Sequence, residues 1–341
     1  MVLRAFVLRR ARISAAAKYP DPIDTDGNTK DLIARGVLGD GIARVVVVVA
    51  TQVTREAAER HDASPAAAVA LGRGAMAGLL LATLTKDRER VSLQVMGNGP
   101  LGSLTVDASS SGTVRAFVRD PHAGPSAAPR VRLPGPGTGG GADLASWVGR
   151  TGTVSVLRDL GLGEPFTGQT SVATGEIDED IERYLLDSEQ IDSALGCEVL
   201  LSSDGDVRLA VGILVQALPN TDGATLVATA RQRLREGALA AALPTTGAAP
   251  FDDVAAVVRA VVGDEPSDLR ELERRPVRFH CPCSRERASA TLALLGAVEL
   301  ADMIATDGRA DVTCDFCRRQ YQFTAEELQT IRAALDPARP N

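Results

Sequence analysis

The apolar positions in the first part of the chain predict a buried strand followed by a buried helix. The run from Ile42 to Val49 is rich in β-branched residues, which fit a strand covered on both faces. Ser64 and Pro65 then predict the start of a helix, because serine caps helices and proline favours the first helical position. The Ala-, Gly- and Leu-rich segment that follows continues this helix to Leu84, and its small residues permit close packing.

A hairpin and a loop rich in Gly and Pro follow this helix. The segments 91–95 and 101–106 alternate apolar and polar residues on either side of a Gly/Pro turn, which is typical of paired strands. Residues 112–118 predict a further strand. More than half of the residues from 123 to 141 are Gly or Pro, and such a composition buries little apolar surface. We therefore expect a mobile surface loop there.

The pattern then leads from an amphipathic helix through two strands to short helices. Residues 176–195 carry apolar side chains mostly at three-to-four-residue intervals, with acidic residues in the first turns, and predict the amphipathic helix. Two strands, 199–201 and 207–218, follow across a short turn. The segments 224–243 and 251–262 are helical but short, and such helices need a surface to pack on. We expect them to form a linker docked on the core.

Composition narrows the class of protein. The 341 residues are 45% hydrophobic and 24% charged, as in a soluble globular protein with room for two or three compact units. The net charge is −7, and residues 271–341 contain 10 arginines and 11 acidic residues, so their formal charge is −1. Only 3% of the residues are aromatic, which is unfavourable for stacking on bases. Nucleic acid is therefore not an expected partner.

The apolar stretches of the sequence do not predict a membrane span. The richest, Val45–Ala50 and Ala75–Ala82, fall far short of the roughly 20 residues that cross a bilayer. The first twenty residues carry five basic residues and no acid, a weak likeness to a transit peptide, but they lack the pattern of a signal peptide. We expect a solvated extension or an edge strand at the N-terminus, and a cytoplasmic protein.

Four of the five cysteines predict a metal site near the C-terminus. Cys281 and Cys283 form a C-x-C pair, and Cys314 and Cys317 form a C-x-x-C pair after 30 intervening residues. Two close pairs separated by a loop can supply four thiolates to one tetrahedral zinc ion. In an extended segment residues i and i+2 point to the same side, so both sulfurs of the first pair can reach one ion.

Other interpretations of these residues stay open at this point. The zinc could be a permanent link that holds together a module too small to fold on its apolar core alone. A disulfide framework fits less well, because the sequence lacks a secretory signal and Cys197 is distant. Cys197 has the character of a small buried residue, and His280 is at most a marginal ligand. The acidic residues between Glu176 and Asp180 suit a helix N-terminus better than catalysis.

The cysteines lie within motifs that resemble one known family, the bacterial redox-regulated holdases of the heat-shock protein 33 family. The likeness covers roughly residues 31–330. The motifs that carry it are, in chain order, Gly97–Gly102, Gly175-Glu176 with Tyr184, Ser188–Gln190, Leu214–Pro219, Cys281–Arg287, Leu295-Gly296 with Glu299-Leu300, Val312–Cys317 and Tyr321–Phe323.

The resemblance implies an α+β fold with a large N-terminal sheet-and-helix core. Its parts would be an N-terminal extension over 1–30, the core chaperone domain over 31–222, a metastable helical linker over 223–270, and a small zinc-binding redox-switch module over 271–341. It implies an ATP-independent chaperone that holds unfolded proteins under oxidative stress, and no enzyme activity. The implied partners are unfolded clients, a second copy of the chain when oxidised, and ATP-dependent foldase chaperones.

The mechanism that the resemblance implies can be stated with the cysteines of this chain. In the reduced, inactive form one zinc ion per chain would hold all four sulfurs as thiolates, the form that oxidants attack. Oxidation would pair Cys281 with Cys283 and Cys314 with Cys317, release the zinc and unfold the module, so that the linker loses its support. A disulfide across C-x-C closes a small strained ring, and strained disulfides are readily reduced.

Two other functions compete with this hypothesis. A constitutive zinc-ribbon adaptor or nucleic-acid-binding protein would use the same ligands. Its only support in the sequence is a set of arginines near them: Arg285, Arg287, Arg318 and Arg319. A disulfide oxidoreductase would need its C-x-x-C at the start of a helix in a βαβ unit, whereas Cys314 follows Val312 and precedes an aromatic run.

Overall fold

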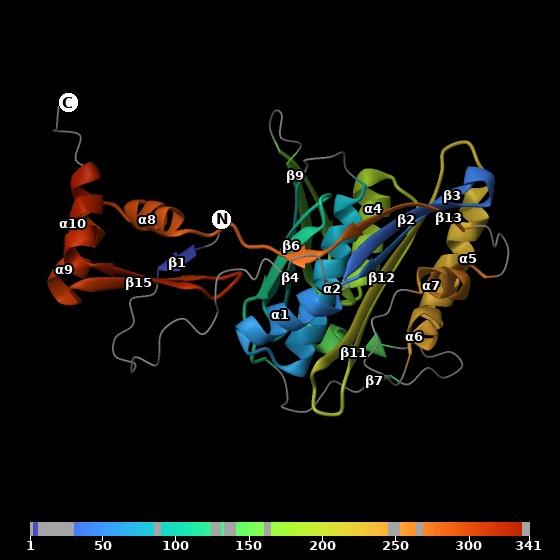
Figure 1. Cartoon of the computed structure of the whole chain (residues 1–341), viewed down its shortest axis with the longest axis horizontal. Coiled ribbons are helices and arrows are strands. Elements are labelled where there is room, and N and C mark those ends of the chain that lie inside the picture. Colours follow the sequence, from blue (N-terminus) through green and yellow to red (C-terminus); the bar gives the residue numbers. More distant parts are fainter. Residues whose placement is uncertain are drawn as a thin grey trace. The chain divides into compact units, whose positions relative to one another are not determined.

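The structure is a computed structural model of the chain (Figure 1). It describes residues 3–5, 31–84, 90–123, 131–132, 141–159, 165–244, 253–263 and 269–335. Contacts divide the chain into two compact units with a boundary between His280 and Cys281. Among the described residues, the core unit contains 31–280 and the small unit contains 281–335 together with 3–5. Helices and sheets are mixed in both units, as the α+β prediction requires.

One antiparallel sheet of five strands forms half of the core unit. Its strand order is β11-β12-β3-β2-β13, and the strands are β2 (Leu32–Leu38), β3 (Ala43–Val49), β11 (Ser193–Leu201), β12 (Val207–Ala217) and β13 (Leu269–Pro276). The predicted β-branched strand is confirmed as β3, which lies at the centre of the sheet with nearly every residue buried. Helices α2 (Pro65–Ala82) and α7 (Val254–Val262) pack on its two faces, which explains why the run is apolar on both of them.

A second sheet of six strands forms the other half of the core unit. Its strand order is β10-β9-β4-β5-β6-β14, and the strands are β4 (Arg90–Gly97), β5 (Ser103–Ser109), β6 (Thr113–Val118), β9 (Gly152–Asp159), β10 (Phe166–Ser171) and β14 (Arg278–Phe279). The predicted hairpin is confirmed as the antiparallel pair β4–β5, and the next predicted strand is β6. The short strand β14 joins this sheet in parallel with β6.

Helix α2 (Pro65–Ala82) packs between the two sheets, next to α1 (Thr51–His61). Its start is capped as predicted, because the Ser64 hydroxyl accepts a hydrogen bond from the Ala67 N–H. Glycines permit its close approach, since a Cβ at Gly74 would lie 2.5 Å from Leu104 of β5. By length and composition alone this helix could cross a membrane, but 94% of it is buried inside the core unit.

Three further helices cover the opposite face of the five-stranded sheet (Figure 1). They are α5 (Gly223–Arg235), α6 (Ala238–Ala242) and α7 (Val254–Val262). Alternate residues of β12, Val211, Ile213 and Val215, face these helices, whereas Gly212 faces α2. The single helix predicted over 224–243 is wrong, because Gly237 has a φ of 86° and separates α5 from α6.

Two other predictions are corrected in the core unit. The amphipathic helix is α4 (Ile177–Glu189), which stops six residues before the predicted end at Leu195 because Gln190 takes a left-handed conformation with φ 57°. Part of the loop predicted over 123–141 is ordered, since β7 (Val131–Arg132) pairs with β8 (Gly141–Ala142). The remainder of that loop, 124–130 and 133–140, lies outside the described residues. The short helix α3 (Ala145–Val148) follows β8.

The small unit is built on a hairpin of β15 (Arg309–Cys314) and β16 (Gln320–Thr324). Three helices belong to it: α8 (Arg285–Ala293), α9 (Ala297–Thr306) and α10 (Ala325–Ala334). Its apolar core is small and includes Val312, Leu300 and Leu328, each 0% exposed. A solvated extension and an edge strand were the two alternatives for the N-terminus, and within it the described residues Leu3–Ala5 form β1, which pairs with β15.

Candidate metal centre

The four predicted ligands converge in the small unit. Their Sγ atoms all lie within 4.8 Å of one another. Cys281 Sγ lies 3.7 Å from Cys314 Sγ, and Cys283 Sγ lies 3.2 Å from Cys317 Sγ. Four sulfurs at about 2.3 Å from a tetrahedral zinc ion would lie about 3.8 Å apart, so the observed spacing fits one such ion.

Local structure explains how each pair is positioned. Cys314 ends β15, and the tight turn to β16 carries Cys317, held by a hydrogen bond of 2.9 Å from the Arg318 N–H to the Cys314 carbonyl. The other pair lies on the extended segment before α8, whose start is capped by the Ser284 hydroxyl. The C-x-C spacing places both sulfurs of this segment on one side, as the sequence predicts.

A hydroxyl group completes the surroundings of the sulfurs. Tyr321 on β16 donates a hydrogen bond of 3.2 Å to Cys283 Sγ. A hydrogen bond to the charged form stabilises it, so this contact favours a thiolate at Cys283. In the sequence Tyr321 stands out only as part of a motif, and this contact was not predicted. Its place on the strand after the C-x-x-C turn is the one signal that could have indicated it.

The electrostatics of the four sulfurs favour a bound cation. Hydrogen bonds with Cys281 and then Cys283 raise the pKa of Cys314 and Cys317 far above the usual range of a thiol. The contact with Cys281 also opposes ionisation of Cys283, but hydrogen bonds with its other neighbours lower its pKa to about 6. Four sulfurs this close cannot all be ionised without a nearby positive charge. A divalent soft metal with thiolate ligands supplies that charge, so the residues present fit zinc.

The other candidate residues of the sequence, His280 and Cys197, lie in the core unit and outside the group of four sulfurs. His280 is exposed, and its backbone N–H donates to the Val114 carbonyl in the core unit. Cys197 lies in β11 and is 1% exposed, which confirms the expectation of a small buried residue.

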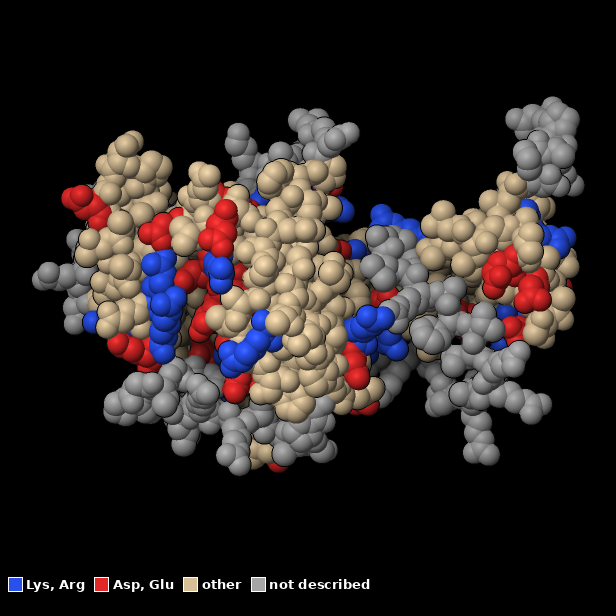
Figure 2. All heavy atoms as spheres, turned by 180° about the vertical axis from the view of Figure 1, so that it is seen from behind, with Lys and Arg blue, Asp and Glu red and all other residues tan. Residues whose placement is uncertain are grey.

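One of the arginines that would support nucleic-acid binding, Arg285, makes contacts within the small unit. The Arg285 guanidinium lies 4.5 Å from the centre of the Phe323 ring and pairs with Glu327 at 2.6 Å. On the face in Figure 2, Lys and Arg are interspersed with Asp and Glu and do not form one continuous basic surface. Both observations agree with the nearly balanced charge of residues 271–341, which disfavours binding to a polyanion.

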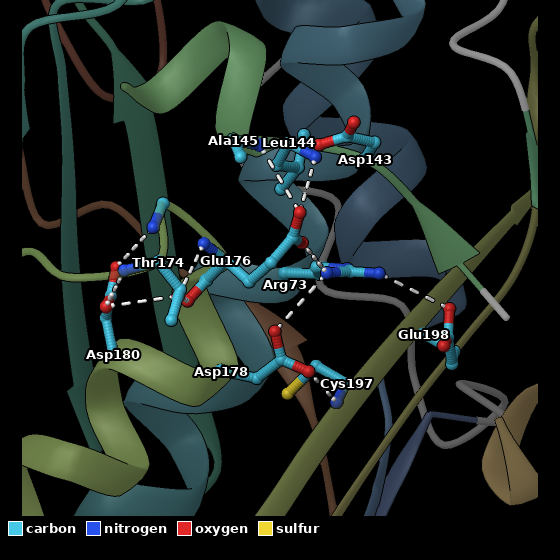
Figure 3. A network of polar contacts seen from close by, with 11 residues as sticks. Arg73, Asp143, Leu144, Ala145, Thr174, Glu176, Asp178, Asp180, Cys197 and Glu198 are labelled. Atoms are coloured by element: carbon cyan, nitrogen blue, oxygen red, sulfur yellow. Dashed lines mark hydrogen bonds and ion pairs between the residues drawn. The ribbon is translucent and has the colours of Figure 1, made fainter. Parts of the chain in front are cut away.

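A second polar cluster, which was not predicted from the sequence, lies in the core unit (Figure 3). Arg73 on α2 is 4% exposed and forms ion pairs with Glu176 at 2.7 Å, Asp178 at 3.3 Å and Glu198 at 3.5 Å. The acidic residues at the start of α4 are therefore tertiary partners as well as favourable charges at a helix N-terminus. The one sequence signal is a lone arginine within an otherwise apolar helix, because a buried charge needs a partner.

The carboxylates of this cluster hold neighbouring backbone as well (Figure 3). Glu176 Oε1 accepts hydrogen bonds from the N–H groups of Leu144 and Ala145, and Asp178 accepts one from the Cys197 N–H. Burial raises the pKa of Glu198 to about 8 and that of Glu176 to about 7, while Arg73 opposes both shifts. These contacts give the cluster a structural role that joins α2, α4 and β11.

Comparison with known proteins identifies the family. A model of the family described as Hsp33 protein matches residues 31–324. The 33 kDa chaperonin of Bacillus subtilis is 36% identical over 302 residues, which cover 89% of this chain and 98% of that protein. The 33 kDa chaperonin of Gloeobacter violaceus is 40% identical over 305 residues, which cover 88% of this chain and 95% of that protein. The crystal structure of the 33 kDa chaperonin of Thermotoga maritima matches with a TM-score of 0.74 at 30% identity, over 89% of this chain and 98% of that one. The chain therefore belongs to the Hsp33 family of chaperones, as its motifs predict.

Proposed function

We propose that this chain is an ATP-independent holdase that oxidation of its four clustered cysteines converts to the client-binding form. The observation that carries the proposal is the approach of four sulfurs within 4.8 Å, in a small unit joined directly to the core unit at Cys281. Bound zinc would keep the sulfurs as thiolates and link the segment of Cys281 and Cys283 to the turn of Cys314 and Cys317. We propose the functional division as core 31–222, linker 223–270 and zinc module 271–341. Residues 271–280 of that last segment pair with the core sheets through β13 and β14, and the predicted ligands begin at Cys281.

The switch itself is a two-electron oxidation of each cysteine pair. One thiolate attacks peroxide, the O–O bond breaks, hydroxide leaves and a sulfenic acid forms. The second thiol of the pair attacks that sulfur, so that an S–S bond forms and water leaves. Two peroxide molecules thus convert Cys281 with Cys283, and Cys314 with Cys317, to disulfides that no longer offer thiolates to a metal.

The energy of the metal site is large enough to control the folding of the small unit. A structural zinc site contributes on the order of 10 kcal/mol, which is comparable to the total stability of a domain. The apolar core of this unit is small, so loss of the thiolates should unfold it. The short helices α5, α6 and α7 persist only while they are packed, and their loosening would expose the apolar face of the five-stranded sheet.

The proposal extends to partners and location. Exposed apolar surface on the linker and sheet would bind unfolded clients and, in the oxidised form, a second copy of the chain. Clients would pass to ATP-dependent foldase chaperones in the cytoplasm. The chain itself would use no nucleotide and catalyse no reaction.

Zinc content and client holding, measured in the same samples, test this function. We expect one zinc per chain in reducing buffer, loss of zinc after peroxide, suppressed aggregation of an unfolded client, and reversal of both by dithiol plus zinc. The variant Cys197→Ser should behave like the parent, whereas Cys314→Ser should lose zinc. Peptide mapping of the oxidised protein reads out the proposed disulfides. Equal holding in the reduced and oxidised states would favour the constitutive zinc-ribbon alternative.

A further inference from the structure

Strand β13 covers an edge that would otherwise be exposed. It pairs antiparallel with β2 from Leu269 opposite Leu38 to Pro276 opposite Leu32, and it is the last strand on that side of the five-stranded sheet. Without β13, the N–H and C=O groups of β2 would form the edge. Such an edge is a ready template for another extended chain.

The side chains of β13 contribute little to holding it in place. None of its eight residues is fully buried, Leu269 is only partly buried, and Leu272 is 60% exposed at a bulge in the pairing. An ion pair with β2 joins Glu273 to Arg35 at 3.6 Å, with about a third of each side chain exposed (33% and 31%), and Arg275 Nη1 donates a hydrogen bond of 3.0 Å to the Ser110 carbonyl. Exposed ion pairs of this kind contribute little to stability. Backbone hydrogen bonds therefore provide most of the attachment.

Strand β2, in contrast, is fixed in the core. Ile33 and Leu38 are each 1% exposed, so β2 keeps its place when its neighbour leaves. A Cβ on Gly36 would lie 2.8 Å from Leu269 Cδ1 and 2.9 Å from the Arg270 carbonyl oxygen. The edge is thus shaped for the close approach of a backbone at this point.

The chain on both sides of β13 belongs to the proposed switch. Upstream, Leu269 touches the apolar cluster beneath α5, α6 and α7. Downstream, Val277 is 0% exposed and Phe279 lies under the Arg60 guanidinium at 5.0 Å, and Cys281 follows two residues later. Along the chain, the weakly attached strand therefore lies between the proposed linker helices and the metal ligands.

We propose that β13 is an autoinhibitory strand and that the edge of β2 beneath it binds an extended segment of an unfolded client. The client would add to β2 as an antiparallel strand, through main-chain hydrogen bonds that do not depend on its sequence. Its alternate side chains would continue the apolar face to which Ala34 and Leu38 belong. The inference rests on the proposed function, because oxidation of the cysteines is what would release β13.

A tethered strand tests the inference. Arg35 and Glu273 are directly opposed across the two strands, a spacing that a disulfide can bridge. In the double variant Arg35→Cys with Glu273→Cys, the tether would hold β13 on β2. We expect this variant to release zinc on peroxide treatment like the parent, but to capture at least about tenfold less of a cysteine-free protein diluted from guanidinium chloride. The control Arg35→Ala with Glu273→Ala removes the ion pair without a tether and should capture client at least as well as the parent.

The outcomes separate the two proposals. If the parent neither loses zinc nor captures client after oxidation, the proposed function fails. If the parent does both and the tethered variant captures client equally well, only the β2-edge inference fails.

Hydrogen exchange on the oxidised parent gives an independent reading that needs no variant. Amides of 32–38 should lose protection on oxidation and regain it when client is added. Unchanged exchange on adding client overturns the inference. Protection that instead rises with protein concentration alone also overturns it, because the edge would then pair with a second copy.

Discussion

At the scale of single residues, the ion pairs of Arg73 connect helix α2 to helix α4 and strand β11. Replacing Arg73 with methionine would leave Glu176, Asp178 and Glu198 close together without a cation. We expect Arg73→Met to lower the free energy of unfolding by about 3–5 kcal/mol, measured by urea denaturation, because it removes the cation and the N–H donors from a cluster of buried carboxyl groups. The matched control is Arg183→Met on α4, whose arginine is 54% exposed and pairs along its own helix. It should change stability by less than about 0.5 kcal/mol, and a similar small effect at Arg73 would contradict the structural role.

The same cluster predicts how stability depends on pH. Burial raises the pKa of Glu198 to about 8 and of Glu176 to about 7, both above the ordinary value of 4.5. The folded state then binds more protons than the unfolded state between about pH 4.5 and 8. The free energy of unfolding should therefore fall as pH rises through this window, by up to about 1.4 kcal/mol per pH unit for each group. Glu198→Gln should flatten the profile measured by urea denaturation from pH 5 to 9. A variant slope equal to that of the parent would show that another group titrates.

The residues of the two clusters also show what sequence could and could not predict. The four cysteines could be predicted as metal ligands because two close cysteine pairs at this spacing are typical of a tetrahedral zinc site. The partners of Arg73 could not be predicted, because Glu176 and Glu198 lie more than a hundred positions away and each has a local explanation. The hydrogen bond from Tyr321 to Cys283 could not be predicted for the same reason, because only the folded hairpin brings the hydroxyl to that sulfur.

At the scale of elements, local patterns predicted the strands and helices that their own side chains stabilise. Strand β3 and helix α2 agree with prediction because burial on all sides leaves a continuous apolar run. The ends of α4 and α5 were missed, since each depends on one left-handed residue, Gln190 or Gly237. Strand β13 was not predicted at all, because its charged sequence forms a strand only where β2 offers backbone partners.

The linker helices lead to a prediction about activation without oxidant. Val257 of α7 is 0% exposed in the apolar cluster on the five-stranded sheet. Val257→Ala removes buried methyl groups and should weaken the packing of α7 by about 1–3 kcal/mol, so the reduced protein should already bind a hydrophobic dye and hold some client. Arg259→Ala changes an exposed residue of the same helix and should leave the reduced form inactive. If both variants hold no client before oxidation and respond like the parent afterwards, α7 is not part of the switch.

At the scale of the whole molecule, metal removal can be separated from oxidation. If zinc is bound as proposed, a chelator in reducing buffer would remove it while the cysteines stay as thiols, so any structural change would report on the metal alone. We expect amides of 281–335 to lose protection from hydrogen exchange, because the apolar core around Val312 is small, while β3 and β12 keep theirs. Zinc-saturated chelator is the control and should change nothing, and added zinc should restore the protection. Loosening of α5–α7 in the same sample would show that unfolding of the small unit suffices to weaken the linker. If 281–335 stays protected without zinc, the apolar core holds that unit by itself, and oxidation must act on the linker by another route.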